Sequence, residues 1–289
     1  MPIVDTLDST MNYREQGEGA PIVFLHGNPT SSYIWRKVMG FGRLPGRLLA
    51  PDLIGMGESG KPDIDYTYAD QIRYLDAWFD ALGVEDAVLV GHDWGGTLAF
   101  DWASRHPERV RGIAFTEAIV KPLEWEELPP PARELFHAIK TPGVGEEMVL
   151  DQNAFLDPGV PATVVGGLSA EDMATYLAPY PTPASRVPIL QWARANPLGG
   201  EPADVAERIA GLDAWLAASH ELPKLLLTFE PGPGTTMGPE LIQWCVDTIA
   251  ALEVDKLGLA GHQTPEDQPE AIAESLAGWL TRHELLDRG

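Results

Sequence analysis

Four short apolar runs, at residues 21–25, 47–50, 87–90 and 110–115, recur through the first 120 residues. Each run is too short for a helix and lacks polar alternation, which is typical of parallel strands buried on both faces. Between them, apolar residues fall at helical spacing over 68–82, and a second helical stretch over 95–106 ends before Pro107. Strands that alternate with helices predict an α/β fold with right-handed crossovers and a mostly parallel sheet.

This alternation breaks after Phe115 and returns near residue 224. From 121 to 217 the prolines are frequent, the helical patterns are short and many large apolar side chains require burial. Strand-like runs return at 224–229 and 254–260, with helical patterns over 239–252 and 269–286. We therefore expect a core domain of residues 1–120 and 218–289, interrupted by a helical cap of residues 121–217.

The run at 87–90 leads into GHDWGG, a glycine-rich turn that opens directly into a helical pattern. The form GxDxG is that of a nucleophile elbow, GxSxG, with Asp93 in the place of the serine. Such a turn projects its central side chain at the carboxyl end of the sheet, beside the free N–H groups of the next helix. The alternative interpretation is that Asp93 is an ordinary helix N-cap.

The composition narrows the range of partners. The net charge of −23, from 43 acidic and 20 basic residues, argues against nucleic acid or an anionic membrane surface and favours a neutral or cationic substrate. The single cysteine, Cys245, excludes an internal disulfide, and residues 1–16 lack a signal-peptide pattern, so we expect a cytoplasmic protein. No apolar run is long enough to span a bilayer. The sequence leaves open whether the protein is a monomer or a dimer.

Neither a metal nor a cofactor is indicated. The run GMGESG at 55–60 resembles a phosphate-binding loop, but Pro62 stands where Ser or Thr would bind magnesium, and no helix pattern follows. The seven histidines show no metal-ligand spacing. Instead, Asn28, Asp93, Glu117 and His262 each follow a predicted strand, at the sheet edge where open α/β folds bind ligands.

Several segments together resemble the haloalkane dehalogenases of the α/β-hydrolase superfamily. They are HGNPTSSYIW from His26, APDLIGMGESGKPD, GHDWGG, FTEAIVKPLEW and AGHQTPEDQPE near the end. The resemblance runs from about Asn12 to the last helix. It implies a cofactor-free hydrolase that converts a small apolar halogenated substrate and water into an alcohol and a halide.

Each catalytic role that the resemblance implies can be assigned to a residue of suitable chemistry. Asp93 is already ionised at neutral pH and can displace a halide to form an ester. His262 is the predicted base for hydrolysis, with Glu117 as its partner and Glu230 as the second choice. Asn28 and Trp94 offer N–H donors for the halide and for the oxyanion. By resemblance, the pocket is expected to be lined by Trp125, Phe136, Phe155, Trp192 and Leu198.

The sequence departs from the family pattern at Gln263, Thr264 and Pro265, which precede Glu266 and Asp267. Pro265 fixes the backbone near the base and raises the question whether the histidine loop is displaced. Three alternatives stay open. An epoxide hydrolase would use the same Asp93 and His262 with two phenol donors, for which Tyr176 and Tyr180 are available. A coelenterazine-type luciferase and a binding protein without turnover could share the same fold.

Overall fold

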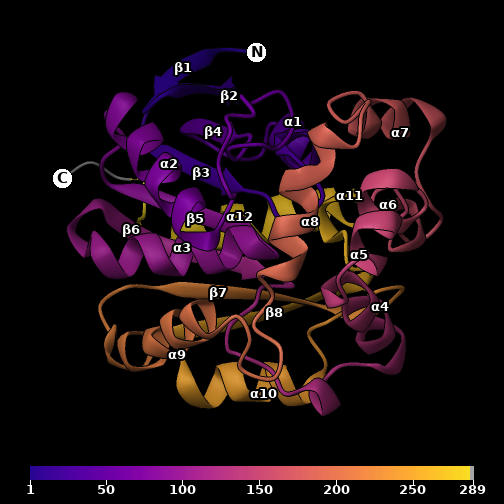
Figure 1. Ribbon diagram of the computed structural model, residues 1–289. Coiled ribbons are helices and arrows are strands. Elements are labelled where there is room, and N and C mark those ends of the chain that lie inside the picture. The colour runs from indigo at the N-terminus through magenta and orange to yellow at the C-terminus, as the bar shows by residue number, and fades with distance from the viewer. Residues whose placement is uncertain (287–289) are drawn as a thin grey trace.

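In the computed structural model, which describes residues 1–286, eight strands form one sheet in the order β1-β2-β4-β3-β5-β6-β7-β8 (Figure 1). The pairs β1–β2 and β2–β4 are antiparallel, and the other pairs are parallel. The strands are β1 (Ile3–Thr6), β2 (Ser9–Gln16), β3 (Pro21–Leu25), β4 (Arg47–Pro51), β5 (Ala87–His92), β6 (Val110–Thr116), β7 (Lys224–Pro231) and β8 (Leu252–Ala260).

The predicted α/β class with a mostly parallel sheet is confirmed, and each predicted strand is present. Two strands, β1 and β2, were not predicted. They form one edge of the sheet, where β2 buries Met11 and Tyr13 and leaves Glu15 and Gln16 exposed. A strand that is half exposed shows only a weak apolar pattern, which explains why the sequence did not reveal it.

The helices lie on both faces of the sheet and beside its carboxyl edge (Figure 1). The α-helices are α1 (Arg36–Gly40), α2 (Tyr68–Ala81), α3 (Trp94–Arg105), α4 (Pro130–Lys140), α5 (Val144–Glu146), α6 (Gly159–Ala162), α7 (Ala170–Leu177), α8 (Val187–Arg194), α9 (Ala203–Ala218), α10 (Pro239–Thr248), α11 (Thr264–Asp267) and α12 (Pro269–Arg282). Helix α2 begins where the sequence predicts, because Thr67 and Asp70 form a capping box.

Alternate residues of the buried strands point to opposite faces, as strand geometry requires. On one face, Val23 and Leu89 pack with α2, α3 and α9. On the other face, Ile22 and Val88 pack with α1, with Trp35 just before it, and with α12, which contributes Trp279. The strands that carry the predicted site residues are therefore covered on both sides, and their carboxyl ends are held by two cores.

Residues 121–217 contain α4 to α9 and no strand of the sheet. Helices α4 to α8 lie on the right of the sheet in Figure 1. Helix α9 differs, since it packs against α3 and its Arg208 pairs with Asp101 of that helix at 2.5 Å. The division into a core and a cap of residues 121–217 is our proposal, and α9 is the part of this cap that belongs to the layer over the sheet.

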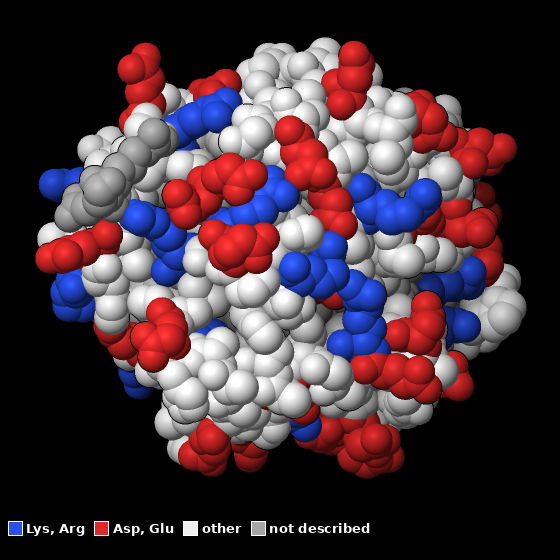
Figure 2. All heavy atoms as spheres, turned by 90° about the vertical axis from the view of Figure 1, so that its left-hand side faces the viewer, with Lys and Arg blue, Asp and Glu red and all other residues white. Residues whose placement is uncertain are grey.

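Within residues 1–286, no helix combines the length and the apolar character needed to cross a membrane. Acidic and basic side chains lie next to one another over the face seen in Figure 2. On this face the excess of acidic residues is therefore distributed rather than gathered in one patch.

The contact between α2 and α3 provides a test of how core packing supports α3, the helix that follows the turn at Asp93. The rings of Phe79 and Trp102 stack with their centroids 3.9 Å apart, and both residues are fully buried. We expect Trp102→Ala to lower the free energy of unfolding by about 3–5 kcal/mol, because it removes a large side chain from a packed core. Urea denaturation measures this loss. Activity per folded molecule should change little, and a loss below 1 kcal/mol would contradict the packing argument.

Candidate active site

The turn between β5 and α3 has the geometry of a strained elbow. Asp93 has φ 53° and ψ −127°, a conformation that a non-glycine residue rarely adopts. A Cβ atom at Gly95 would lie 2.0 Å from the carbonyl oxygen of Leu25 on β3. Only glycine therefore lets the start of α3 approach β3 so closely, and this approach projects the side chain of Asp93 from the sheet edge.

Asp93 makes no side-chain cap hydrogen bond to its helix, so the N-cap interpretation does not describe it. Its Oδ1 accepts a hydrogen bond from the backbone N–H of Asn28 at 2.9 Å. The residue is 8% exposed. Burial raises the pKa of Asp93, while His262 and the backbone N–H groups of Trp94 and Asn28 oppose this rise.

His262 lies directly opposite this carboxylate. Its Nε2 is 3.7 Å from Asp93 Oδ2, and its Nδ1 is 2.9 Å from Glu117 Oε2. Burial by itself lowers the pKa of His262, but the hydrogen bond and charge of Glu117, with a contribution from Asp93, outweigh it and raise the pKa. The Glu117 contact makes Nδ1 the proton-bearing nitrogen and leaves Nε2 facing Asp93.

Glu117 is held by the loop that follows β7. Its Oε2 accepts hydrogen bonds from Thr236, at 2.7 Å from the backbone N–H and at 2.9 Å from the hydroxyl. Glu230, the second choice from the sequence, is exposed and pairs with Leu259 in the β7–β8 ladder. The structure thus places Glu117, and not Glu230, against the imidazole. Thr236 was not predicted, although its place just after a strand at the carboxyl edge could have indicated it.

His92 supports the base from behind. Its Nε2 lies 2.7 Å from the carbonyl oxygen of His262. Burial, followed by the nearby His262, lowers the pKa of His92 to about 3, so this histidine is neutral and its Nε2–H donates to that carbonyl. This contact ties the backbone of His262 to the end of β5.

Asp93 and His262 line an apolar cavity of about 290 Å³, whereas Glu117 is not among its lining residues. Asn28 and Trp94 lie on its wall beside Asp93. One N–H of the Asn28 side chain donates to the carbonyl oxygen of Ile189 at 3.0 Å, which leaves the second for another partner. The ring of Trp94 packs on Trp192, with centroids 4.6 Å apart. Two residues with side-chain N–H donors, Asn28 and Trp94, therefore line the same apolar cavity as Asp93.

Of the five cap residues predicted for the pocket, Phe136 and Phe155 line the cavity, and three do not. Trp192 lies behind Trp94, and Trp125 stacks on His137 with centroids 3.8 Å apart. Leu198 is buried in bridges to Leu123 and Glu201. The sequence missed other lining residues on the cap, which include Leu123, Leu128, Pro131, Ala132, Leu135, Val160 and Thr163.

Pro265 is accommodated at the start of a short helix, three residues after His262. It lies in the first turn of α11, where a proline needs no N–H partner. The N–H of His262 donates to the carbonyl oxygen of Pro233 at 2.9 Å, and the N–H of Thr264 donates to that of His262 at 2.9 Å. Backbone hydrogen bonds therefore help to hold the loop before Pro265.

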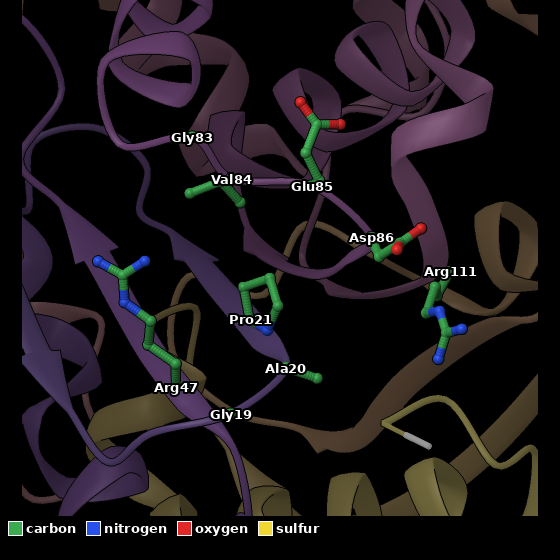
Figure 3. Close-up of a pocket in the computed structure, with 9 residues that line it drawn as sticks. All are labelled: Gly19, Ala20, Pro21, Arg47, Gly83, Val84, Glu85, Asp86 and Arg111. Carbon is green, nitrogen blue, oxygen red and sulfur yellow. The ribbon is translucent and has the colours of Figure 1, made fainter. Parts of the chain in front are cut away.

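A second hollow, of about 440 Å³, lies near the amino ends of β3, β4 and β6 (Figure 3). These ends are at the opposite edge of the sheet from Asp93. Its wall includes Arg47 and Arg111, and Arg47 pairs with Glu15 at 2.7 Å. The residues that line it include no histidine, serine or cysteine. Within residues 1–286, no group of three or more His, Cys, Asp or Glu side chains could hold a metal ion.

Comparisons with known proteins agree with this geometry. A family model described as alpha/beta hydrolase fold matches residues 20–141. The chain is 46% identical to a haloalkane dehalogenase of Mesorhizobium japonicum, over 96% of this chain and 90% of that protein. It is 44% identical to one of Bradyrhizobium diazoefficiens, over 97% of this chain and 94% of that protein.

The solved structures that resemble this chain include haloalkane dehalogenases. The crystal structure of a putative ancestral haloalkane dehalogenase superposes with a TM-score of 0.94 at 46% identity, covering 98% of this chain and 99% of that one. The haloalkane dehalogenase DbeA of Bradyrhizobium elkani gives a TM-score of 0.93 at 46% identity, covering 99% of each chain. The chain therefore belongs to the haloalkane dehalogenase family of the α/β-hydrolase fold.

Proposed function

We propose that this protein hydrolyses the carbon–halogen bond of small apolar haloalkanes through a covalent ester on Asp93, without a cofactor. The observation that carries the proposal is the juxtaposition of a buried carboxylate and a histidine–glutamate pair at one end of an apolar cavity. The substrate and water enter this cavity, and the alcohol, the halide and a proton leave it. The single, buried Cys245 supports a cytoplasmic location.

In the first step, the free oxygen of Asp93 attacks the carbon that bears the halogen. The new carbon–oxygen bond forms as the carbon–halogen bond breaks, and the halide leaves with the electron pair. The reaction needs no base, because the carboxylate is already the nucleophile. It suits a site in which Asp93 Oδ1 is fixed by the backbone N–H of Asn28 and the carboxylate lies at the cavity wall.

The departing halide requires donors rather than a full positive charge. The side-chain N–H groups of Asn28 and Trp94 are the donors that we assign to it, since both residues lie on the cavity wall beside Asp93. Neutral donors in an apolar cavity stabilise developing charge without holding the halide too strongly for release. Trp192 supports this arrangement by packing against the indole of Trp94.

In the second step, His262 removes a proton from water, and the resulting hydroxide adds to the Asp93 ester carbon. The N–H groups of Asn28 and Trp94 stabilise the oxyanion. The intermediate collapses, the alcohol leaves with the proton from His262, and the Asp93 acid releases the remaining proton. Glu117 stabilises the imidazolium that forms during this step.

The positions of the two tyrosines argue against an epoxide hydrolase. The hydroxyl of Tyr176 donates to Glu266 at 2.6 Å, and that of Tyr180 accepts from the N–H of Gly57 at 3.0 Å. Both are buried, and neither lines the cavity of Asp93. An epoxide oxygen in the cavity would therefore lack the two phenol donors that this chemistry requires.

The nucleophile is tested by substitution. We expect Asp93→Asn to lower halide release from 1,2-dibromoethane on the order of 10⁴-fold or more, because the amide is a poor nucleophile. Halide is measured by ion chromatography. The wild-type protein should turn over neither styrene oxide nor coelenterazine. Epoxide opening without halide release, light emission, or an unchanged rate in Asp93→Asn would contradict the proposed function.

The role of His262 as the base is tested by the pH dependence of kcat. Hydrolysis requires neutral His262, so kcat should rise with pH and level off above a pKa higher than the ordinary value of about 6.5. Glu117→Gln keeps a hydrogen-bond acceptor but removes the negative charge that opposes the effect of burial on the pKa of His262. We expect this variant to lower kcat by about 10²- to 10⁴-fold and to shift the apparent pKa downward. The pH profile of kcat in both proteins measures this, and an unshifted profile would refute the role of Glu117.

A further inference from the structure

We infer that Asp267 is a positioning residue for ester hydrolysis, which ties the loop of the base to the cap and thereby fixes the place of His262. The base loop is residues 261–263, and the cap segment is residues 163–165. This inference rests on the proposed function and adds to it a residue outside the site described above. It predicts that Asp267 affects only the second of the two chemical steps.

One carboxylate bridges the two segments. Asp267 Oδ2 accepts a hydrogen bond from the backbone N–H of Gly261 at 2.8 Å, and its Oδ1 accepts from that of Val165 at 2.9 Å. Hydrogen bonds from N–H groups to an ionised acceptor are among the stronger ones in proteins. Figure 1 shows α11, which carries Asp267, next to α6, from which the cap segment continues.

A second contact joins the same two segments. The N–H of Gln263 donates to the carbonyl oxygen of Thr163 at 3.3 Å. A Cβ atom at Gly261 would lie 2.2 Å from this oxygen, so only glycine permits the approach. The backbone on both sides of His262 is thus held against the cap segment.

The junction bears directly on the chemistry, because Thr163 and His262 line the same cavity. His262 Nε2 and Asp93 Oδ2 are 3.7 Å apart, and the base must aim a water at the ester carbon. Misplacement of a catalytic group by about 1 Å can cost about 10²-fold in rate. Asp93 itself is held by β5, α3 and Asn28. Loss of the Asp267 bridge should therefore displace the base and leave the nucleophile in place.

Glu266, the preceding residue, has different partners and provides a comparison. Its side chain is fully buried and accepts from Arg36, Lys37 and the hydroxyl of Tyr176. These contacts join α11 to α1 and α7, and none of them touches the base loop. Two consecutive carboxylates therefore both join the core to the cap, but only Asp267 bonds to the backbone beside His262.

The experiment separates the two steps by rapid-quench kinetics with 1,2-dibromoethane. In Asp267→Asn, the amide cannot accept both N–H groups with its two terminal atoms. We expect the alkylation rate to stay within about twofold and hydrolysis to slow by about 10- to 100-fold. The variant should then release a burst of about one halide per active site, and mass spectrometry should detect the ester on Asp93.

The controls are Glu270→Gln and Glu266→Gln. Glu270 is an exposed acid in the first turn of α12, and its substitution removes the same charge without touching the loop. It should leave both steps unchanged. Glu266→Gln removes a buried carboxylate from α11 and should lower the melting temperature without producing a halide burst. A burst of equal size in Glu266→Gln would overturn the inference, because general loosening of α11 would then explain it.

Asp267→Glu keeps the charge and both acceptor oxygens on a longer side chain. We expect it to regain part of the hydrolysis rate lost in Asp267→Asn, with alkylation unchanged. If Asp267→Asn does not fold, Asp267→Glu carries the test alone, with slower hydrolysis than wild type as the expected result. Equal loss of both steps, or no loss, would overturn the inference. A wild-type protein that releases no halide would instead refute the proposed function.

Discussion

The structure depends on keeping a carboxylate ionised in a place from which water is largely excluded. Burial of a negative charge is costly unless fixed donors compensate for it. The backbone N–H groups that oppose the effect of burial on Asp93 belong to Asn28, in the loop that follows β3, and to Trp94, the first residue of α3 after the end of β5. Because they belong to the backbone, the fold itself has to bring these two strand ends together. The parallel pairing of β3 with β5 does so.

The same requirement explains the strain at the elbow. Asp93 and Glu117 both have positive φ, at 53° and 49°, although neither is glycine. They follow β5 and β6, two neighbouring strands buried in the cores on both faces. A packed framework of this kind can hold conformations that cost about 1–3 kcal/mol each. The strain turns the side chain of each acid toward the imidazole that lies between them.

His262 differs from the two acids, because it lies in a loop rather than at a strained strand end. Contacts from three directions hold this loop: Pro233 after β7, His92 before the elbow, and the cap segment through Asp267. The base is thus located by tertiary contacts, whereas the nucleophile is located mainly by its own turn. For this reason we expect the two proposed steps of the reaction to respond separately to changes in the cap.

The sequence by itself determined the local features: buried strands from apolar runs, the elbow from its glycines, and the chemistry of Asp93 and His262 from their side chains. It left Glu117 and Glu230 as alternatives, since both follow strands. Only the sheet order and the loop around Thr236 decided between them. The cap residues that line the cavity were harder to predict, because a short helix can turn any of several apolar faces inward. Their packing placed Phe136 in the cavity and Trp192 behind Trp94, and such choices depend on neighbours that lie far away along the chain.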